Sequence, residues 1–223
     1  MHSDNVFMAS TTNAPNTSDM PDDDLMLAFA RGDARAFEAL YARHESALLR
    51  FLRRLMGAQL AAQVEEVFQE TWLRIIAARD SFVAQGADDQ KTGARWRTWA
   101  FTIAHNAAMD RLRVSGREVS VDGQDEGEDM LDWLQAKLDR SHPADEDEAY
   151  WRAAGRQMLH CLDELPADQR AAFLLHYEDE DTVEGLATRL GLAFETAKSR
   201  LRYALKKLRH CMRRYLVEME AGT

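Results

Sequence analysis

The sequence contains little of what holds secreted or membrane proteins together. Among its 223 residues there are two cysteines, Cys161 and Cys211, which excludes a multi-disulfide scaffold and fits a reducing cytoplasm. No apolar run approaches the roughly 20 residues that a helix needs to span a bilayer, so we expect no membrane insertion. The first 24 residues are polar and acidic, unlike a secretory signal peptide. We therefore expect a cytoplasmic protein.

Residues that interrupt helices are also scarce, with 4 prolines and 11 glycines. Hydrophobic residues make up 46% of the chain, which is enough to build cores. Alanine, leucine, arginine and glutamate are common, and this composition favours helices. No segment shows the alternation of apolar and polar residues that is typical of a strand. The predicted fold class is all-α.

Positive charge is scarce overall but concentrated in one place. The formal net charge is -10, and much of the acid lies in residues 1–24 and 116–148. Residues 193–214 instead hold eight Lys or Arg against the single acid Glu195. A basic cluster that stands apart in an acidic protein indicates nucleic-acid binding at that cluster.

Changes in composition divide the chain into four parts. Residues 1–21 form a polar tail that we expect to be disordered, and residues 22–114 a first small helical domain. Residues 115–148 form a glycine-containing acidic flexible linker, and residues 149–217 a second small helical domain.

Capping residues place helices in both domains. Asp33 is a suitable N-cap for a helix that ends at Gly57, and further helices are expected over 64–76 and from Trp96 onward, after a loop at 83–95. In the second domain Pro166 opens a helix, and Asp181 or Thr182 caps the next one. A turn at 190–192 then leads into a long basic helix, which together make a helix-turn-helix pattern.

Several motifs carry a resemblance to a known family. ARGDARAFEALYARH, VEEVFQETWLRIIAAR and WRTWAFTIAHNAAMDRLR resemble the sigma-2 domain of bacterial sigma factors of the extracytoplasmic-function group, within the sigma-70 family. The segment from Leu162 to Arg209 resembles the sigma-4 domain. The chain departs from the pattern at Gly185, where the family often has Ile, and in the long 83–95 loop.

The resemblance implies partners and sites. It implies binding of core RNA polymerase (its beta-prime clamp and beta flap), promoter recognition, duplex melting, and control by an anti-sigma factor, with no catalysis, cofactor or metal of the chain's own. The polymerase-binding helix would use Glu65, Glu66, Gln69, Glu70 and Arg74. Melting at the minus-ten element would use Trp96, Arg97, His105, Asn106, Arg111 and Arg113, while Trp99 and Ile103 face the core. The last helix would read the minus-thirty-five element with Glu195, Thr196, Lys198, Ser199, Arg200 and Arg202.

Two other functions compete with this interpretation. A stand-alone helix-turn-helix regulator would bind duplex DNA without polymerase, but it leaves the first domain unexplained. A small hydrolase could use His44, Asp110 and His176, but no spacing supports it. A zinc site at His160-Cys161 and His210-Cys211 lacks finger spacing, so we expect Cys161 to pack in a core instead.

Overall fold

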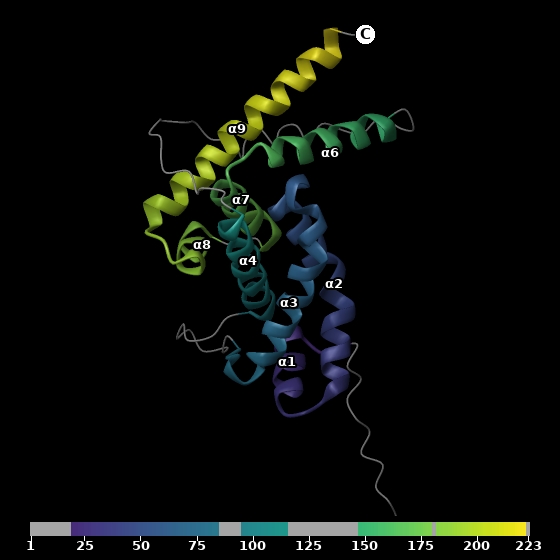
Figure 1. Ribbon diagram of the computed structural model, residues 1–223, viewed down its shortest axis with the longest axis vertical. Helices are drawn as coiled ribbons and strands as arrows, with labels where there is room; N and C mark the ends of the chain where they lie inside the picture. The colour runs from purple at the N-terminus through teal and green to yellow at the C-terminus, as the bar shows by residue number, and fades with distance from the viewer. Residues whose placement is uncertain (1–18, 85–94, 116–146, 180–181, 222–223) are drawn as a thin grey trace, which may run out of the picture.

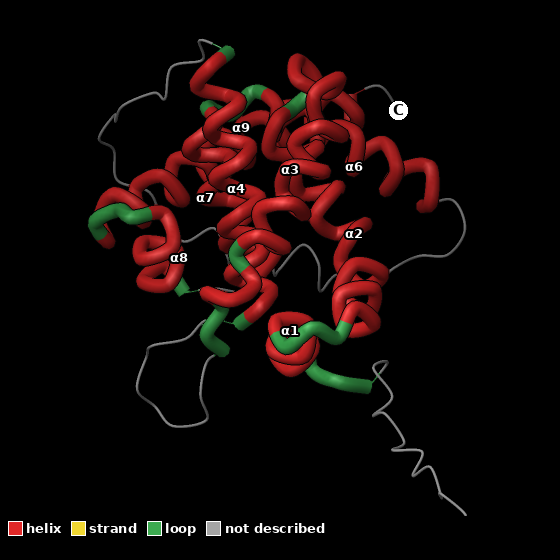
Figure 2. The backbone as a smooth tube through the Cα atoms, turned by 60° about the horizontal axis from the view of Figure 1, so that its bottom comes forward, coloured by secondary structure: helices red, strands yellow, loops and turns green. Residues whose placement is uncertain are grey.

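The computed structural model describes residues 19–84, 95–115, 147–179 and 182–221. Over these residues it contains helices and connecting turns but no β-strand (Figure 2), which confirms the predicted all-α fold. The disordered tail expected over 1–21, the loop at 83–95 and the acidic linker at 115–148 lie largely outside the described residues.

Over its described residues, the first domain has four α-helices and two short 3₁₀ turns. They are α1 (Asp22–Ala30), α2 (Ala34–Met56), η1 (Ala58–Gln63), α3 (Val64–Ala77), η2 (Arg79–Ser81) and α4 (Trp96–Val114). Asp33 caps α2, since its side chain accepts a hydrogen bond from the backbone N–H of Arg35 at 3.0 Å. Helices α2, α3 and α4 pack against one another, and α1 lies across one end of them (Figure 1).

An acidic start fixes α1 to its neighbours. The Asp22 carboxylate accepts hydrogen bonds from Arg43 at 2.9 Å and from His44 at 2.7 Å. Burial alone would raise the pKa of Asp22, but these two partners lower it below its usual value. The next residue, Asp23, accepts a 2.6 Å hydrogen bond from the backbone N–H of Trp96, so α1 also caps the beginning of α4.

The second domain consists of α6 (Asp147–Asp163), α7 (Ala167–Asp179), α8 (Val183–Leu190) and α9 (Phe194–Ala221). The expected helix-turn-helix is confirmed. Thr182 caps α8 by accepting a hydrogen bond from the N–H of Gly185 at 3.1 Å. Gly191 ends α8 in the left-handed conformation, with φ 63° and ψ 35°, which glycine adopts without a steric penalty. The chain then turns directly into α9.

The two domains contact each other mainly through α7, with a smaller contact between α6 and α2. Helix α7 packs against the end of α2 and against α4, and α9 and α6 lie beyond it in Figure 1. At the contact, Gly57 of α2's C-terminal turn lies under the buried guanidinium of Arg170, with Asp163 beside it. A Cβ atom built on Gly57 would lie 2.9 Å from the Asp163 carboxylate oxygen and closer still to the Arg170 guanidinium. Only glycine therefore fits this point of the interface.

Candidate nucleic-acid and polymerase interfaces

The N-terminal turns of α9 present the predicted duplex-reading residues. The left-handed turn at Gly191 directs this end of α9 away from α8. Glu195 and Lys198 are exposed, whereas Thr196, Ser199, Arg200 and Arg202 are half-buried. The Lys198 ammonium lies 5.6 Å from the ring centroid of Phe194, itself an exposed aromatic. Phe194 was not among the predicted DNA contacts, although an aromatic residue at the start of a basic helix is a signal that the sequence carries.

Arg200 is held inside its own domain. Its guanidinium lies 2.8 Å from a carboxylate oxygen of Asp168 on α7. The contact is an ion pair without hydrogen-bond geometry. Asp168 is buried, which raises its pKa, and the positive charges of Arg200 and Arg113 oppose that rise only in part. Removing Arg200 would therefore leave a buried carboxyl group without its nearest cation.

Trp96 corrects the predicted minus-ten surface. It was expected to stack on a base, but its side chain is 0% exposed. Its ring centroid lies 4.4 Å from that of His44 and 6.4 Å from that of Trp72, so it fills the core of the first domain. Trp99, expected to face the core, packs at its edge against Phe82 with 5.2 Å between ring centroids and remains partly exposed. Of the two tryptophans, only Trp99 offers a surface to an unstacked base.

His105 is also internal. Burial lowers its pKa to about 4, and the positive charges of Arg113, Arg189 and Arg200 add to the effect against a 3.2 Å hydrogen bond with Asn106. At neutral pH it is thus an uncharged buried imidazole and not a cationic DNA contact. Asn106 and Arg113 are the exposed members of the predicted set, and Arg97 and Arg111 are half-buried. The Arg97 guanidinium lies 4.7 Å from the ring centroid of Phe101.

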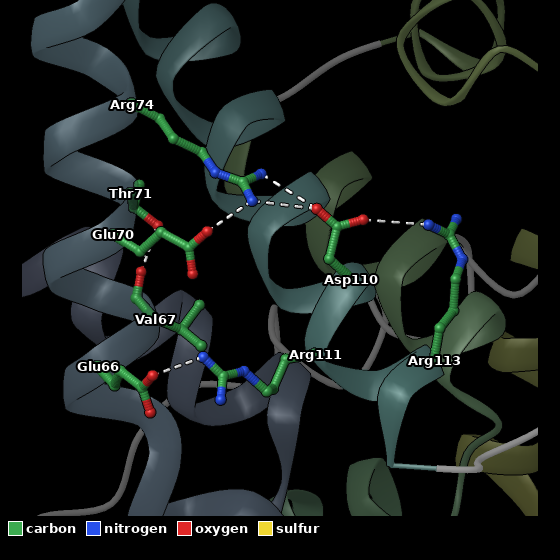
Figure 3. Close-up of polar contacts among 8 residues, drawn as sticks. All are labelled: Glu66, Val67, Glu70, Thr71, Arg74, Asp110, Arg111 and Arg113. Carbon is green, nitrogen blue, oxygen red and sulfur yellow. Dashed lines mark hydrogen bonds and ion pairs between the residues drawn. The ribbon is translucent and has the colours of Figure 1, made fainter.

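The predicted polymerase helix and the predicted melting helix share one polar network (Figure 3). Arg74 of α3 donates to Glu70 at 2.6 Å and to Asp110 of α4 at 3.1 Å. Burial opposes the charge of Arg74, but these two acceptors raise its pKa. Asp110 also accepts from Arg113 at 3.3 Å. This network of hydrogen bonds therefore fixes α3 and α4 relative to each other.

A second set of pairs extends this network along α3. Arg111 of α4 donates to Glu66 at 2.8 Å, and Arg53 of α2 donates to Glu65 at 3.0 Å. Four of the five residues assigned to polymerase from the sequence thus have partners within the domain. Gln69 is exposed, and Leu73, one turn further along the same face, is 65% exposed although it is apolar. Leu73 was not among the residues predicted to contact polymerase.

The candidate DNA surfaces of the two domains lie close together. The positive charges of Arg113 on α4 and Arg200 on α9 both lower the pKa of Asp168. Those of Arg189 and Arg200 both lower the pKa of His105. Helix α7, which carries Asp168, packs between them. Residues predicted to contact separate promoter elements thus meet at one interdomain contact.

Cys161 and Cys211 form a disulfide that joins α6 to α9, with a Cα–Cα distance of 5.9 Å. Cys161 is buried, as expected, and it is bonded to Cys211, which the sequence did not predict. The sulfurs are therefore not free to hold a metal ion. Among the described residues no group of three metal-binding side chains comes together, and none of their helices is both long and apolar enough to cross a membrane.

Comparison with known proteins covers both domains. The family model described as Sigma-70 region 2 matches residues 40–118, and the model described as Sigma-70, region 4 matches residues 155–208. The ECF RNA polymerase sigma factor SigL of Mycobacterium tuberculosis is 32% identical over 184 residues, which is 81% of this chain and 90% of SigL. The chain belongs to the extracytoplasmic-function (ECF) sigma factors of the sigma-70 family.

Other relatives agree with this assignment. The RNA polymerase sigma factor CarQ of Myxococcus xanthus is 29% identical over 84% of this chain and 95% of its own length. Two solved structures share the fold. RpoE bound to the anti-sigma factor NepR, from Bartonella quintana, has a TM-score of 0.53 at 24% identity and covers 81% of this chain and 98% of its own. CnrH in complex with the cytosolic domain of CnrY has a TM-score of 0.51 at 21% identity and covers 91% and 99%.

Proposed function

We propose that this ECF sigma factor binds core RNA polymerase, directs it to promoters and assists strand opening, with the bond-making left to polymerase. The observation that carries the proposal is the presence of region 2 and region 4 in order on one chain, each on its own helical domain. A stand-alone regulator would need only the second domain and would leave the exposed face of α3 without a role.

The polymerase contact is assigned to the exposed face of α3. Gln69 and Leu73 lie one turn apart, and neither is buried by the rest of the chain. An exposed leucine beside an amide suits the apolar centre and polar rim of a protein interface. The paired residues Glu66, Glu70 and Arg74 hold the helix against α4 and add charge at its edge.

The DNA contacts are divided between the domains. Lys198, Ser199 and Arg202, with Arg200 once it leaves Asp168, are suited to duplex phosphates and base edges. On α4, Arg97, Asn106 and the exposed edge of Trp99 combine positive charge, an amide and an aromatic surface, which is the chemistry that holds single strands. Trp96 and His105 serve as their internal support.

An anti-sigma factor is proposed as a further partner. The two solved relatives were each captured with a partner, named in one case as an anti-sigma factor and in the other as the cytosolic domain of CnrY. The compact contact of the two domains through α7 is consistent with a form that a partner could hold closed.

Transcription with purified core polymerase tests the proposal. Addition of this chain should produce new start sites on genomic templates that core enzyme alone does not use. Gln69→Ala with Leu73→Ala should weaken binding to core enzyme at unchanged fold, whereas Gln59→Ala, an exposed amide on η1, should not. The stand-alone regulator alternative needs only the second domain. If that isolated domain gave full start-site selection, the assignment of polymerase contact to α3 would be contradicted.

Arg200→Ala tests the duplex contact. We expect a loss of about 1–3 kcal/mol in promoter binding. Asp168→Asn, which frees Arg200 without removing it, should not weaken promoter binding. Equal losses in both variants would show that the pair serves the fold and not the reading of DNA.

A further inference from the structure

The disulfide forms part of the wall of a basic pocket. Cys161 and Cys211 line a cavity of about 700 Å³ between the end of α6 and the second half of α9. The bond itself is little exposed, with Cys161 at 1% and Cys211 at 7%. This cavity offers a reagent a path to the sulfurs.

The pocket is strongly cationic. Among the residues that the structure describes, Glu164 is the one acidic residue that lines it, and Leu165 and Tyr203 add uncharged wall. The basic lining residues come from three successive turns of α9 and are Lys206, Lys207, Arg209, His210, Arg213 and Arg214. These residues lie beyond the N-terminal turns proposed to read DNA, so the proposed function does not use them. Positive potential in a concave site attracts small anions.

The surroundings of the sulfurs also favour exchange. A nearby cation stabilises a thiolate, which is the species that attacks and leaves in thiol–disulfide exchange. The side-chain amide of Gln157 on α6 donates toward Cys161 Sγ at 3.6 Å and toward Cys211 Sγ at 3.7 Å. Once the bond is broken, the same amide can donate to whichever sulfur carries the negative charge.

We propose that this pocket is a thiol–disulfide exchange site that takes small anionic thiols. In the first step a thiolate RS⁻ attacks Cys211 Sγ, the more exposed sulfur, which forms a mixed disulfide and releases Cys161 as a thiolate. A second equivalent of the thiolate then attacks the external sulfur of the mixed disulfide, which releases Cys211 as a thiolate and yields RSSR. Two electrons pass to the protein, and two protons from the two RSH or from water complete the thiols.

Exchange changes how firmly α6 is attached to α9. Among the described elements α6 packs mainly on α9, with a smaller contact to α2. The disulfide is the covalent part of that attachment, and it closes a loop between residues 50 apart in sequence. Reduction leaves α6 held by noncovalent contacts alone, so the redox state of the cell's thiols sets how firmly the start of the second domain is held.

Exchange kinetics on the oxidised full-length chain test the recruitment of anionic thiols. The probes are glutathione (anionic), 2-mercaptoethanol (neutral) and cysteamine (cationic), with rates normalised to those on bis(2-hydroxyethyl) disulfide. Glutathione should be favoured over cysteamine by about fivefold or more relative to the reference disulfide. Added salt should reduce this preference.

Charge reversal supplies the matched control. Lys207→Glu with Arg213→Glu, both exposed pocket residues, should abolish or invert the preference. Arg31→Glu with Arg35→Glu makes the same change in net charge at exposed positions of the first domain and should leave it intact. The proposal would be overturned if the preference for glutathione over cysteamine equalled that of the reference disulfide, or if the pocket variant left it unchanged. It would also be overturned if both cysteines remained titratable thiols in the presence of an oxidant.

Hydrogen exchange tests the mechanical consequence. Protection of α6 amides should fall on reduction, and the Cys161→Ser, Cys211→Ser chain should show the reduced behaviour under oxidising conditions. Identical protection of α6 in both redox states would refute the proposal that the disulfide holds α6 on α9. None of these readouts requires promoter or polymerase, so they succeed or fail independently of the proposed function.

Discussion

The two domains are stabilised in different ways. The largest fully buried side chains, among them Trp96, Phe51, Phe101 and Leu40, all belong to the first domain. The core of the second domain is built mainly from alanines and leucines with Phe173, together with a disulfide between α6 and α9 and two buried charged residues, Asp168 and Arg170. A small domain with few large core side chains gains most from a covalent bond. Redox change should therefore affect the second domain, and loss of aromatic packing the first.

The largest expected effect is the loss of an aromatic ring from the first core. Trp96→Ala removes a fully buried ring in contact with His44 and Trp72, and should lower the free energy of unfolding of the first domain by about 3–5 kcal/mol. Trp99→Ala, at the partly exposed edge, should cost much less. Chemical denaturation followed by tryptophan fluorescence measures both. Equal costs would mean that the two tryptophans do not differ in structural role.

The next effect is a pH dependence from His105. Its pKa falls from 6.5 to about 4 on folding, so between these values the unfolded chain binds a proton that the folded chain does not. The free energy of unfolding therefore keeps its full value above pH 6.5 and decreases as the pH falls toward 4, by at most about 3 kcal/mol. His105→Gln should flatten the stability profile between pH 6.5 and 4. A wild-type profile with the same slope as the variant would contradict the burial of His105.

The contact between the domains offers a third comparison. Gly57 has φ 71° and ψ 177°, a conformation that costs other residues about 1–3 kcal/mol, and a Cβ there would also meet Arg170. Gly57→Ala should separate α7 from α2, which raises the interdomain distance measured between fluorophores on the two domains. Gly32→Ala, at φ 100° with open space around the new Cβ, should strain the backbone without separating the domains.

A double variant distinguishes the clash from the strain at this contact. Gly57→Ala with Arg170→Ala removes the nearest clashing side chain and should recover part of the short interdomain distance. An unchanged distance in Gly57→Ala alone would mean that the domains are not held together at this point.

Much of the fold was predictable because its signals are local. The cap at Asp33, the end of α2 at Gly57, the cap at Thr182 and the turn at Gly191 are each set by residues within a few positions of one another. The same locality explains the all-α prediction, which rests on composition and the absence of alternation. The order of the motifs along the chain was sufficient to indicate the family.

The errors have a common physical cause. Trp96 and Trp99 are three residues apart on α4, so periodicity places them on neighbouring faces and does not say which one meets α1 and α2. The contacts of the Trp96 ring with His44 on α2 and Trp72 on α3, distant in sequence, decide it. The pairing of Arg200 with Asp168 and the bond between Cys161 and Cys211 likewise depend on how helices pack. Contacts between distant segments are not encoded in local spacing.

The smallest expected effects come from the helix caps, and they compare the two domains on equal chemistry. Asp33→Ala and Thr182→Ala each remove one side-chain acceptor from a backbone N–H, at a cost of about 1 kcal/mol. In the first domain this is small beside the aromatic core, so amide exchange in α2 should change little. In the second domain the same loss should increase exchange in α8 and the adjoining turns of α9, and more so after the disulfide is reduced. If reduction leaves the effect of Thr182→Ala unchanged, the disulfide does not contribute to the stability of the helix-turn-helix, and the contrast between the domains reduces to core size alone.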